Sequence, residues 1–391
     1  MLPLDGITVV SLEHAIAAPF ATRQLADMGA RVIKVERPGV GDFARNYDTR
    51  VNGMASHFVW TNRSKESLTL DVKHAEGSII LQKLVSKADV VVQNLAPGAA
   101  ARLGLGYTAL SKDNPGVIVC NISGYGTGGS DEKRKAYDLL VQSESGFVTT
   151  TGTPDTPSKA GISIADIAAG MYAYTNILAA LLQRGKSGKG CEIDLSMLDA
   201  MTEWMSYPLY YAYKGAEPPA RAGASHATIF PYGPFTVGDG RTVILGLQNE
   251  REWKAFCEVV LEAPELTTDA QFSSNSLRAQ NKDTLTQIIT TSFSDLTTEG
   301  VIERLDRAGI ANANMNEMAD VWNHVQFETR NRWREVDTPA GRIPALLPPG
   351  GIGAEPRMDA VPDLGEHSVA LLAEFGYTEE NITKLQKEKV I

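Results

Sequence analysis

Several signals are scarce or missing in this chain of 391 residues, and each absence excludes a class of protein. The three cysteines, Cys120, Cys191 and Cys257, lie far apart and form no CxxC pair, so neither a disulfide framework nor a zinc knuckle is predicted. The six histidines show no HExxH or similar spacing, so no metal site is expected. No uncharged apolar run of about 18 residues occurs, and no basic segment followed by an apolar stretch opens the chain, so we predict a cytoplasmic protein without a membrane partner.

A positive net charge is also missing. The formal net charge is -10 and the sequence pI is about 5.2, whereas nucleic-acid-binding proteins present basic surfaces. We therefore expect no nucleic-acid partner, and an anionic substrate would have to be bound by local cations. The length and the hydrophobic fraction of 43% predict an ordinary globular protein of about two domains.

The first half of the sequence alternates short β-branched runs with amphipathic stretches, which is typical of parallel strands joined by helices. Ligands of open α/β sheets bind beyond the carboxyl ends of the strands, so the loops after residues 92 and 122 are predicted to form the binding rim. The strands are predicted at residues 7–12, 31–36, 90–92, 117–122 and 191–195, and the helices at 19–28, 76–88, 165–183 and from about 196.

The pattern changes after residue 213, where a stretch rich in proline, glycine and alanine follows. We predict a large α/β domain over residues 1–213, on which residues 330–391 pack back. A linker is predicted over 214–223 and a small domain over 224–329. The small domain is expected to begin with a hairpin over residues 232–247 and to continue mostly with short helices.

A glycine-rich loop follows the strand predicted at residues 117–122, and its glycines are Gly124, Gly126, Gly128 and Gly129. The loop lacks the order of a dinucleotide-binding motif and the terminal Lys-Ser or Lys-Thr of a phosphate loop. Two interpretations remain open. The loop is either a flexible turn after a buried strand or a mobile lid over a substrate.

The segment from Ser163 to Asp166 precedes an apolar helix and matches a capping box, in which an acidic side chain at the third helical position reaches back to the cap residue. The start of that helix also offers unpaired backbone N–H groups and the positive end of the helix dipole. From the spacing alone, Asp166 is either a structural cap or a functional carboxylate.

Scattered cations and two histidines are further candidates for binding. Each cation is either a solvated surface charge or, together with others near the strand ends, a ligand for phosphate groups. His14 follows the first strand and His226 lies in a polar loop, and each is either structural or functional. The cations are Arg37, Lys73, Arg102, Lys133, Arg134 and Lys135.

Taken together, six motifs resemble the class III CoA-transferase family, which includes formyl-CoA transferase, the carnitine CoA-transferases and the α-methylacyl-CoA racemases. The resemblance covers most of the chain, and the motifs are specific in combination. They are LDG at residues 4–6, AAP at 17–19, GARVIKVERP at 29–38, LDVK at 70–73, NLAPG at 94–98 and SGYG at 123–126.

The resemblance implies an α/β fold with an open, Rossmann-like parallel sheet in the large domain and a smaller α+β domain. It also implies a homodimer of two interlocked chains, with each active site between the large domain of one and the small domain of the other. Asp166 matches the catalytic aspartate of the family. The implied contacts with coenzyme A come from His14, Ala15, Ala17, Arg37, Leu70, Val72, Lys73, Asn94, Leu95, Arg102 and Lys135.

An aspartate fits the implied reaction because its carboxyl group, with an ordinary pKa of about 3.9, is ionised at neutral pH and needs no partner base. Its attack on an acyl-CoA thioester gives a mixed anhydride. The released CoA thiolate can attack that anhydride in turn, which conserves the thioester while the acid is exchanged. Water must be excluded, because hydrolysis would dissipate this energy.

Two departures from the family pattern indicate the reaction and the substrate. Where the racemases carry a histidine before an aspartate, this chain has Tyr137 before Asp138, and a tyrosine with a pKa of about 10 is a poor second base. The polyglycine loop of the formyl-CoA branch is replaced by residues 221–226, in which Arg221 and His226 could bind a distal carboxylate.

The sequence therefore favours transfer of CoA from a donor such as succinyl-CoA to a small dicarboxylic acid of the itaconate or mesaconate type, and disfavours formate or oxalate. Tyr137 and Asp138 join the glycine-rich loop, Arg221 and His226 as candidates for substrate binding or for a lid. Two alternatives stay open: an acyl-CoA racemase or epimerase, and a non-catalytic acyl-CoA-binding protein.

Overall fold

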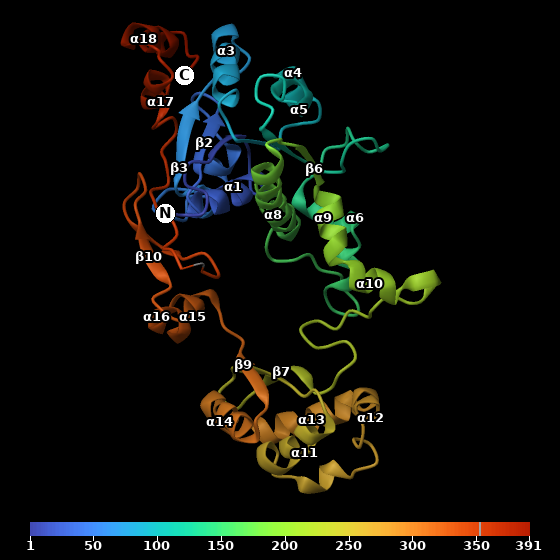
Figure 1. Cartoon of the computed structure of the whole chain (residues 1–391). Coiled ribbons are helices and arrows are strands. Elements are labelled where there is room, and N and C mark those ends of the chain that lie inside the picture. The colour runs from blue at the N-terminus through green and yellow to red at the C-terminus, as the bar shows by residue number, and fades with distance from the viewer. Residues whose placement is uncertain (352) are drawn as a thin grey trace. The chain divides into compact units, whose positions relative to one another are not determined.

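The computed structural model describes residues 1–351 and 353–391, which form two compact units (Figure 1). The large unit comprises residues 1–147, 160–207 and 327–391. The small unit comprises residues 148–159 and 208–326. Each unit has its own hydrophobic core.

A six-stranded parallel sheet forms the centre of the large unit, with the strand order β3-β2-β1-β4-β5-β6. The predicted Rossmann-like α/β fold is thereby confirmed. The order reverses between β1 and β4, and ligands of such sheets bind at this switch point, beyond the carboxyl ends of the strands. The strands are β1 (Thr8–Leu12), β2 (Arg31–Glu36), β3 (Lys65–Thr69), β4 (Val90–Gln93), β5 (Ile118–Ser123) and β6 (Glu192–Ser196).

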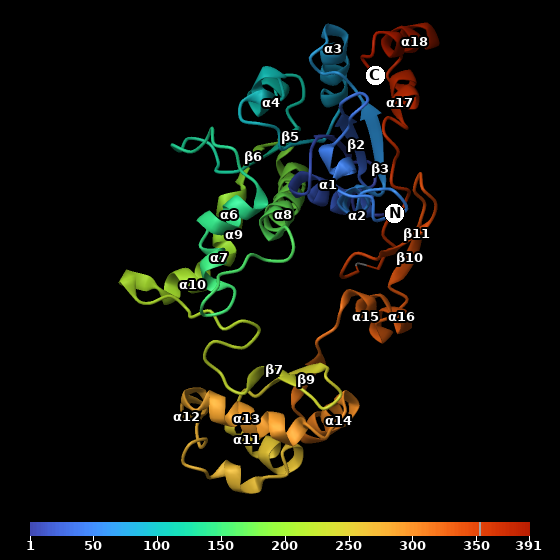
Figure 2. The same cartoon turned by 180° about the vertical axis from the view of Figure 1, so that it is seen from behind.

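Helices cover both faces of this sheet (Figures 1 and 2). Its inner strands are therefore buried on both sides, and their sequences are continuous apolar runs. Val9 packs on one face among alanines of α1 and α8, whereas the next residue, Val10, packs on the other among residues of α3, α17 and α18. The helices of the large unit are α1 (Ala17–Asp27), α2 (Ser56–Asn62), α3 (Ala75–Val85), α4 (Ala99–Arg102), α5 (Tyr107–Leu110), α6 (Asp138–Glu144), α8 (Ile164–Ser187), α9 (Met197–Trp204), α17 (Ser368–Glu374) and α18 (Glu379–Lys387).

The large unit also holds a 3-10 turn, η1 (Phe43–Asn46), and an antiparallel hairpin of β10 (Trp333–Val336) and β11 (Ile343–Leu346). Three short helices lie where the chain passes between the units: α7 (Phe147–Thr150), α10 (Ser206–Tyr211) and α16 (Val325–Thr329). The hairpin falls within residues 330–391, which were predicted to pack back on the large domain, and no strands were predicted there.

The small unit contains a three-stranded antiparallel sheet packed against helices. Its first two strands form the predicted hairpin, and the third, β9, was not foreseen among the short helices. Trp253, Phe256, Phe272 and Phe293 are fully buried and dominate its core. The elements are η2 (Tyr213–Gly215), β7 (Tyr232–Thr236), β8 (Thr242–Gly246), α11 (Glu250–Ala255), η3 (Phe256–Val260), η4 (Pro264–Thr267), α12 (Asn275–Gln280), α13 (Lys282–Phe293), α14 (Thr298–Ala308), β9 (Ala311–Asn314) and α15 (Met318–Trp322).

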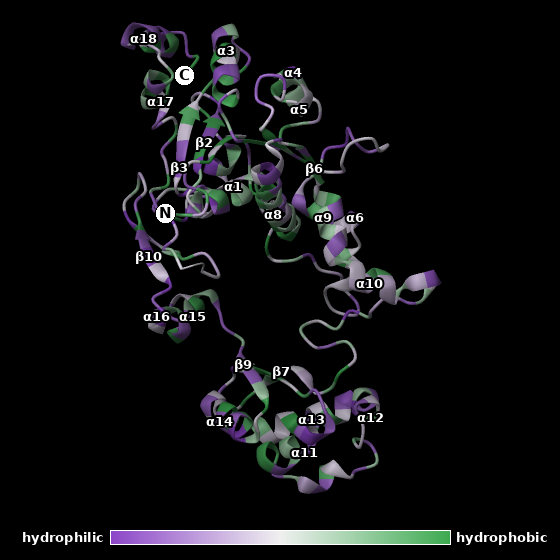
Figure 3. Cartoon of the chain, viewed as in Figure 1, coloured by the Kyte–Doolittle hydropathy of each residue, from purple (hydrophilic) through white to green (hydrophobic). Residues whose placement is uncertain are grey.

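The long helix α8 is apolar enough over its length to cross a membrane by composition alone. In the large unit it packs instead against α1 and the sheet, with Ala165, Ala168, Ala169 and Ala173 buried in the core. Hydropathic colouring shows α8 largely apolar, whereas α18 carries hydrophilic and hydrophobic faces (Figure 3). We therefore interpret α8 as the core helix of an α/β unit.

Candidate active site

The loop that joins β1 to α1, residues 13–17, is held by side chains from two other segments of the large unit. The side-chain amide of Asn94, which follows β4, accepts from the His14 N–H at 2.9 Å and donates to the His14 carbonyl at 2.9 Å. Ala15 adopts a left-handed conformation with φ of 62°, which is unfavourable for a residue with a Cβ atom. Its N–H donates to Oδ1 of the buried Asp42 at 3.1 Å.

Asp166 lies in the first turn of α8 and is half-buried. Burial raises the pKa of its carboxyl group to about 7, the negative charge of Asp138 acts in the same direction, and a hydrogen bond from the Ala17 backbone N–H opposes both. One turn further along α8, a Cβ atom on Gly170 would lie 2.7 Å from the Ala17 carbonyl oxygen. Glycine at this position therefore allows α8 to approach α1, which brings Asp166 to the Ala17 N–H.

The start of α8 is not closed by a capping box, so the structure does not support the alternative in which Asp166 is a structural cap. Ser163 makes no side-chain capping bond. The Ala165 N–H instead donates to Asp138 Oδ1 at 2.8 Å, and Asp138 Oδ2 accepts from Gln142 Nε2 at 2.6 Å. Because a carboxylate from α6 satisfies this end of the helix, the carboxyl group of Asp166 can interact with Ala17.

Tyr47 is a neighbour of Asp166 that the sequence did not reveal. Burial raises the pKa of its phenol to about 12, with further contributions from the negative charges of Asp42 and Asp166. Its ring packs edge-on against His57 and tilts against Phe43. Its place after β2, at the carboxyl edge of the sheet, is the only signal that could have indicated it.

Most residues expected to contact coenzyme A follow β1, β2, β3 and β4 at the carboxyl edge of the sheet. Arg37, Lys73 and Arg102 are exposed, and within residues 1–351 and 353–391 none of the three makes an ion pair. Cations at this edge suit the phosphates of an anionic cosubstrate. The apolar members of the set are the buried Ala17 and Leu70 and the half-buried Ala15, Val72 and Leu95.

His14 is half-buried and stacks on Phe43, with ring centroids 5.1 Å apart. Burial lowers the pKa of its imidazole, although the nearby Asp42 acts in the opposite direction. A neutral ring at pH 7 is therefore favoured. Its Nδ1 lies 3.9 Å from Asp42 Oδ1, which is too long for a hydrogen bond.

The glycine-rich loop is anchored at its beginning and exposed at its end. A Cβ atom on Gly124 would lie 2.2 Å from the Ala136 Cβ, and the Gly126 N–H donates to Ser123 Oγ at 3.0 Å. Thr127 hydrogen-bonds through its hydroxyl to Asp194 of β6. Gly128 and Gly129 are exposed, as is Lys135 beyond them, so any lid movement would be confined to this outer half.

The remaining candidates lie in two different places. Tyr137, directly before α6, is 66% exposed. Arg221 and His226 belong to the small unit. The guanidinium group of Arg221 donates to the carbonyl oxygens of residues 149, 153 and 154, and His226 Nδ1 accepts from two backbone N–H groups, so both side chains already have structural partners.

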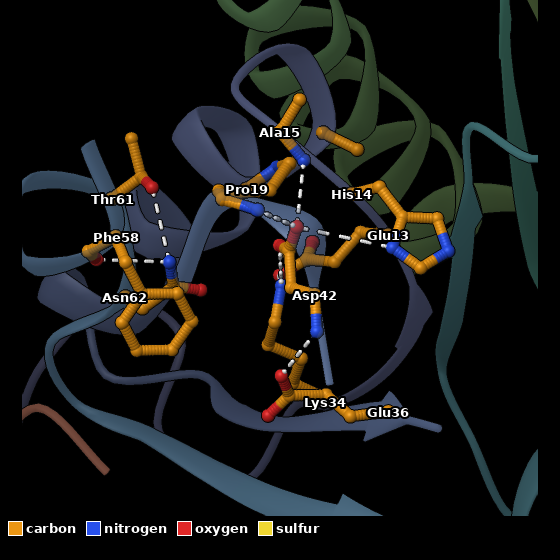
Figure 4. A network of polar contacts seen from close by, with 12 residues as sticks. Glu13, His14, Ala15, Pro19, Lys34, Glu36, Asp42, Phe58, Thr61 and Asn62 are labelled. Atoms are coloured by element: carbon orange, nitrogen blue, oxygen red, sulfur yellow. Dashed lines mark hydrogen bonds and ion pairs between the residues drawn. The ribbon is translucent and has the colours of Figure 1, made fainter. Parts of the chain in front are cut away.

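Behind the loop of residues 13–17 lies a buried cluster of charged side chains, which we call the polar cluster: Glu13, Lys34, Asp42 and Lys65. Figure 4 labels Glu13, Lys34 and Asp42 of this cluster. Lys34 Nζ lies 2.8 Å from Asp42 Oδ2 and 3.2 Å from Glu13 Oε1. Lys65 Nζ lies 2.7 Å from the same oxygen of Glu13. Two cations and two anions thus neutralise one another, which is the condition for burying them.

Comparison with known proteins identifies the class of enzyme. A family model described as CoA-transferase family III matches residues 4–368. The chain is 34% identical over 397 residues to succinyl-CoA:glutarate CoA-transferase of Mus musculus, covering 100% of this chain and 91% of that protein. It is 35% identical over 331 residues to acetyl-CoA:oxalate CoA-transferase of Acetobacter aceti, covering 84% and 85%.

A solved structure supports the same assignment. The crystal structure of a CAIB/BAIF family protein from Brucella suis superposes with a TM-score of 0.85 at 34% sequence identity, covering 96% of this chain and 99% of that one. The protein is therefore an enzyme that uses CoA thioesters as cosubstrates. It belongs to CoA-transferase family III.

Proposed function

We propose that the enzyme transfers CoA from succinyl-CoA to a small dicarboxylic acid, with Asp166 as the nucleophile. The observation that carries this proposal is the position of Asp166. Its half-buried carboxyl group meets the Ala17 N–H of the same loop that supplies predicted CoA contacts, at the N-terminus of α8. A nucleophile and a CoA-binding loop are thus adjacent.

The reaction proceeds through three covalent species on Asp166. One carboxylate oxygen attacks the thioester carbon, the carbon–sulfur bond breaks and CoA thiolate leaves, which gives a mixed anhydride. The thiolate then attacks the aspartyl carbonyl, releases succinate and leaves an aspartyl–CoA thioester. The acceptor carboxylate attacks that thioester to form a second anhydride, from which CoA thiolate takes the new acyl group and frees Asp166.

The other residues have supporting roles in this proposal. Arg37, Lys73, Arg102 and Lys135 bind the phosphates of CoA, together with the backbone contacts expected from the resemblance. The exposed outer half of the glycine-rich loop covers the anhydrides and excludes water. Tyr137, Asp138, Arg221 and His226 remain candidates for the acceptor site.

The acceptor is a dicarboxylate of the itaconate or mesaconate type. Support comes from the two relatives described above, whose names specify glutarate and oxalate, both dicarboxylic acids. The name of the Acetobacter aceti relative specifies oxalate, an acid that the sequence alone had disfavoured. We further propose a cytoplasmic, interlocked homodimer, which sedimentation at micromolar concentration would test.

Mass spectrometry of CoA esters tests the function directly. The enzyme is incubated with succinyl-CoA and, separately, with itaconate, mesaconate, glutarate, oxalate or formate. We expect a new CoA ester and one equivalent of succinate with at least one dicarboxylate, and none with formate. Binding of succinyl-CoA without turnover would indicate a non-catalytic protein, and deuterium exchange at an α-carbon without an acceptor would indicate a racemase.

The pH dependence of transfer provides a second prediction. Because burial and Asp138 raise the pKa of Asp166 to about 7, the ionised nucleophile is lost below that pH. The initial rate should fall about tenfold per pH unit on the acidic side and level off above it. In Asp138→Asn the neighbouring charge is removed, so the acidic limb should move to lower pH.

Asp131→Asn is the matched control for this measurement, since Asp131 precedes the same helix but pairs with Arg134. Its rate profile should coincide with that of the unmodified enzyme. A profile that stays flat across the acidic range, or an acidic limb that does not move in Asp138→Asn, would show that Asp166 does not limit the rate through its ionisation.

A further inference from the structure

The carboxylate of Asp42 makes more contacts than a simple turn requires. Asp42 is fully buried in the large unit at the carboxyl edge of β2. Its Oδ1 accepts from the N–H of Ala44 at 2.9 Å, which caps η1, and from the N–H of Ala15 at 3.1 Å. Its Oδ2 is 2.8 Å from Lys34 Nζ. One carboxylate therefore joins the polar cluster to the loop of residues 13–17 (Figure 4).

The position of Asp42 is itself fixed from two sides. Its backbone N–H donates to Glu36 Oε1 at 3.0 Å, and Arg45 Nε donates to the same oxygen at 2.9 Å. Lys34 in turn contacts Glu13, the first residue of the loop. Since buried charges persist only in a well-defined arrangement, this cluster can hold Asp42 with little freedom to move.

The loop needs such support because its backbone is unfavourable. Ala15 has φ of 62°, in the region that residues with a Cβ atom rarely adopt. Strained backbone of this kind persists where surrounding contacts enforce it, and it is concentrated at functional sites. Here the contacts are Asp42 on the Ala15 N–H and Asn94 on both backbone groups of His14.

The supported loop leads directly to the nucleophile. Two residues after Ala15, α1 begins at Ala17, and a Cβ atom on Gly170 of α8 would lie 2.7 Å from the Ala17 carbonyl oxygen. The start of α1 therefore lies against the first turns of α8, where the Ala17 N–H interacts with the Asp166 carboxylate. Rotation of Ala15 into an ordinary conformation would redirect the following peptide groups. The Ala17 N–H would then no longer point to the carboxylate that it stabilises.

We propose that Asp42 is a positioning residue for CoA transfer: together with Asn94 it holds residues 14–17 in the one backbone conformation that aims the Ala17 N–H at Asp166. This inference rests on the proposed role of Asp166 and adds a second residue to it. Asp42 itself is buried behind the loop and touches no reacting atom.

The test is the rate at which Asp166 is trapped as a hydroxamate when enzyme, succinyl-CoA and hydroxylamine are mixed. In Asp42→Asn we expect trapping and kcat to fall about 10- to 100-fold, because displacements of about 1 Å have effects of this size. KM for succinyl-CoA should change less than kcat. Adding Ala15→Gly should restore part of the rate, since glycine adopts the left-handed conformation without help.

Asp89→Asn is the matched control. Asp89 also accepts from a backbone N–H of β1, that of Thr8, and pairs with a cation, Arg184, but it does so at the opposite end of that strand. Its trapping rate should equal that of the unmodified enzyme. Trapping at the unmodified rate in Asp42→Asn, or no gain from Ala15→Gly, would overturn the proposal.

If Asp42→Asn does not fold, as judged by circular dichroism, Asn94→Ala decides the question. Asn94 is half-buried, and its removal loosens the same loop without leaving a buried charge unpaired. Slower trapping at saturating succinyl-CoA, where weaker binding no longer limits the rate, supports the proposal, whereas an unchanged rate overturns it. Failure of the proposed function is distinguishable from both, because Asp166 would then remain unlabelled in the unmodified enzyme while transfer continued.

Discussion

Replacing Asp166 with asparagine or alanine is expected to lower CoA transfer by about a thousandfold or more, since loss of a covalent nucleophile removes the reaction path itself. Asparagine keeps the size of the side chain but cannot form the anhydride. The measurement is single-turnover formation of the new CoA ester. Near-normal transfer by folded Asp166→Asn would remove the proposed mechanism.

The stability of the Asp166 variants should not fall with their activity. The pKa of Asp166 is about 7 in the folded protein, well above the value of about 3.9 for an unfolded chain. Folding therefore favours the protonated form, so stability falls as the pH rises from about 4 to about 7, and the loss is complete above pH 7. Above pH 7, Asp166→Asn should melt at the same temperature as the unmodified enzyme or higher.

Ser163→Ala is the control for Asp166. Ser163 begins the same helix but makes no capping bond, so its loss should leave transfer and melting close to normal. If Asp166 were only a structural residue, activity and stability would fall together in Asp166→Asn. Loss of activity without loss of stability is the signature of a functional carboxylate.

Glu13→Ala should have the largest effect on stability. Glu13 Oε1 accepts from both Lys34 and Lys65, and Oε2 accepts from Thr22 at 2.6 Å, all in the fully buried interior. Burial lowers the pKa of Lys65 to about 7 even with Glu13 beside it, so removing Glu13 leaves Lys65 without its carboxylate partner and Lys34 with Asp42. Breaking a buried ion pair on one side costs about 3–5 kcal/mol, which urea denaturation would measure.

A double variant distinguishes the cost of an unpaired buried charge from the cost of lost packing. Because replacing both partners of a buried pair by apolar residues is much less costly than removing one, Glu13→Met combined with Lys65→Met should be more stable than Glu13→Met alone. Glu388→Ala is the exposed control. Glu388 lies 4.0 Å from Lys384 on α18, and such surface pairs contribute about 0.3–0.5 kcal/mol. An equal loss in Glu13→Ala and Glu388→Ala would contradict the argument.

The carboxyl group of Glu13 also makes the stability of the protein depend on pH. Burial alone would raise the pKa of Glu13, but Lys65 and Lys34 outweigh it and lower the pKa to about 2. The stabilisation is therefore complete above the unfolded value of about 4.3 and is lost as the pH falls toward 2. Glu13→Gln should show a weaker dependence of unfolding free energy on pH in that window.

The strands of the sheet were predictable where both faces are apolar. Residues 90–92 and 117–122 are β-branched runs because α1 and α8 cover one face and α3 the other. In contrast, β3 (Lys65–Thr69) was not foreseen. Its Lys65 and Ser67 contact the buried carboxylates of Glu13 and Glu36, which are distant in sequence. Polar residues therefore occupy buried positions of this strand, and its sequence does not alternate between apolar and polar residues.

The residues of the candidate site were likewise only partly predictable from the sequence. Residue type indicated Asp166 as a carboxylate at a helix start, but the local pattern left open whether it was a structural cap. Asp138, 27 residues earlier in the chain, satisfies the Ala165 N–H instead. Asp42 had no local signal and Tyr47 had only its place after β2, because each acquires its importance from neighbours brought by other strands.

The sequence by itself determined the parallel α/β sheet, the enzyme family and the carboxylate proposed to react, because burial of apolar runs and the order of short motifs are local properties. Only the tertiary structure decided the pKa of that carboxylate and the groups that surround it. The raised pKa of Asp166, the left-handed Ala15 and the polar cluster behind it depend on charges and backbone groups that become neighbours only when β1, β2, β3 and α8 pack together.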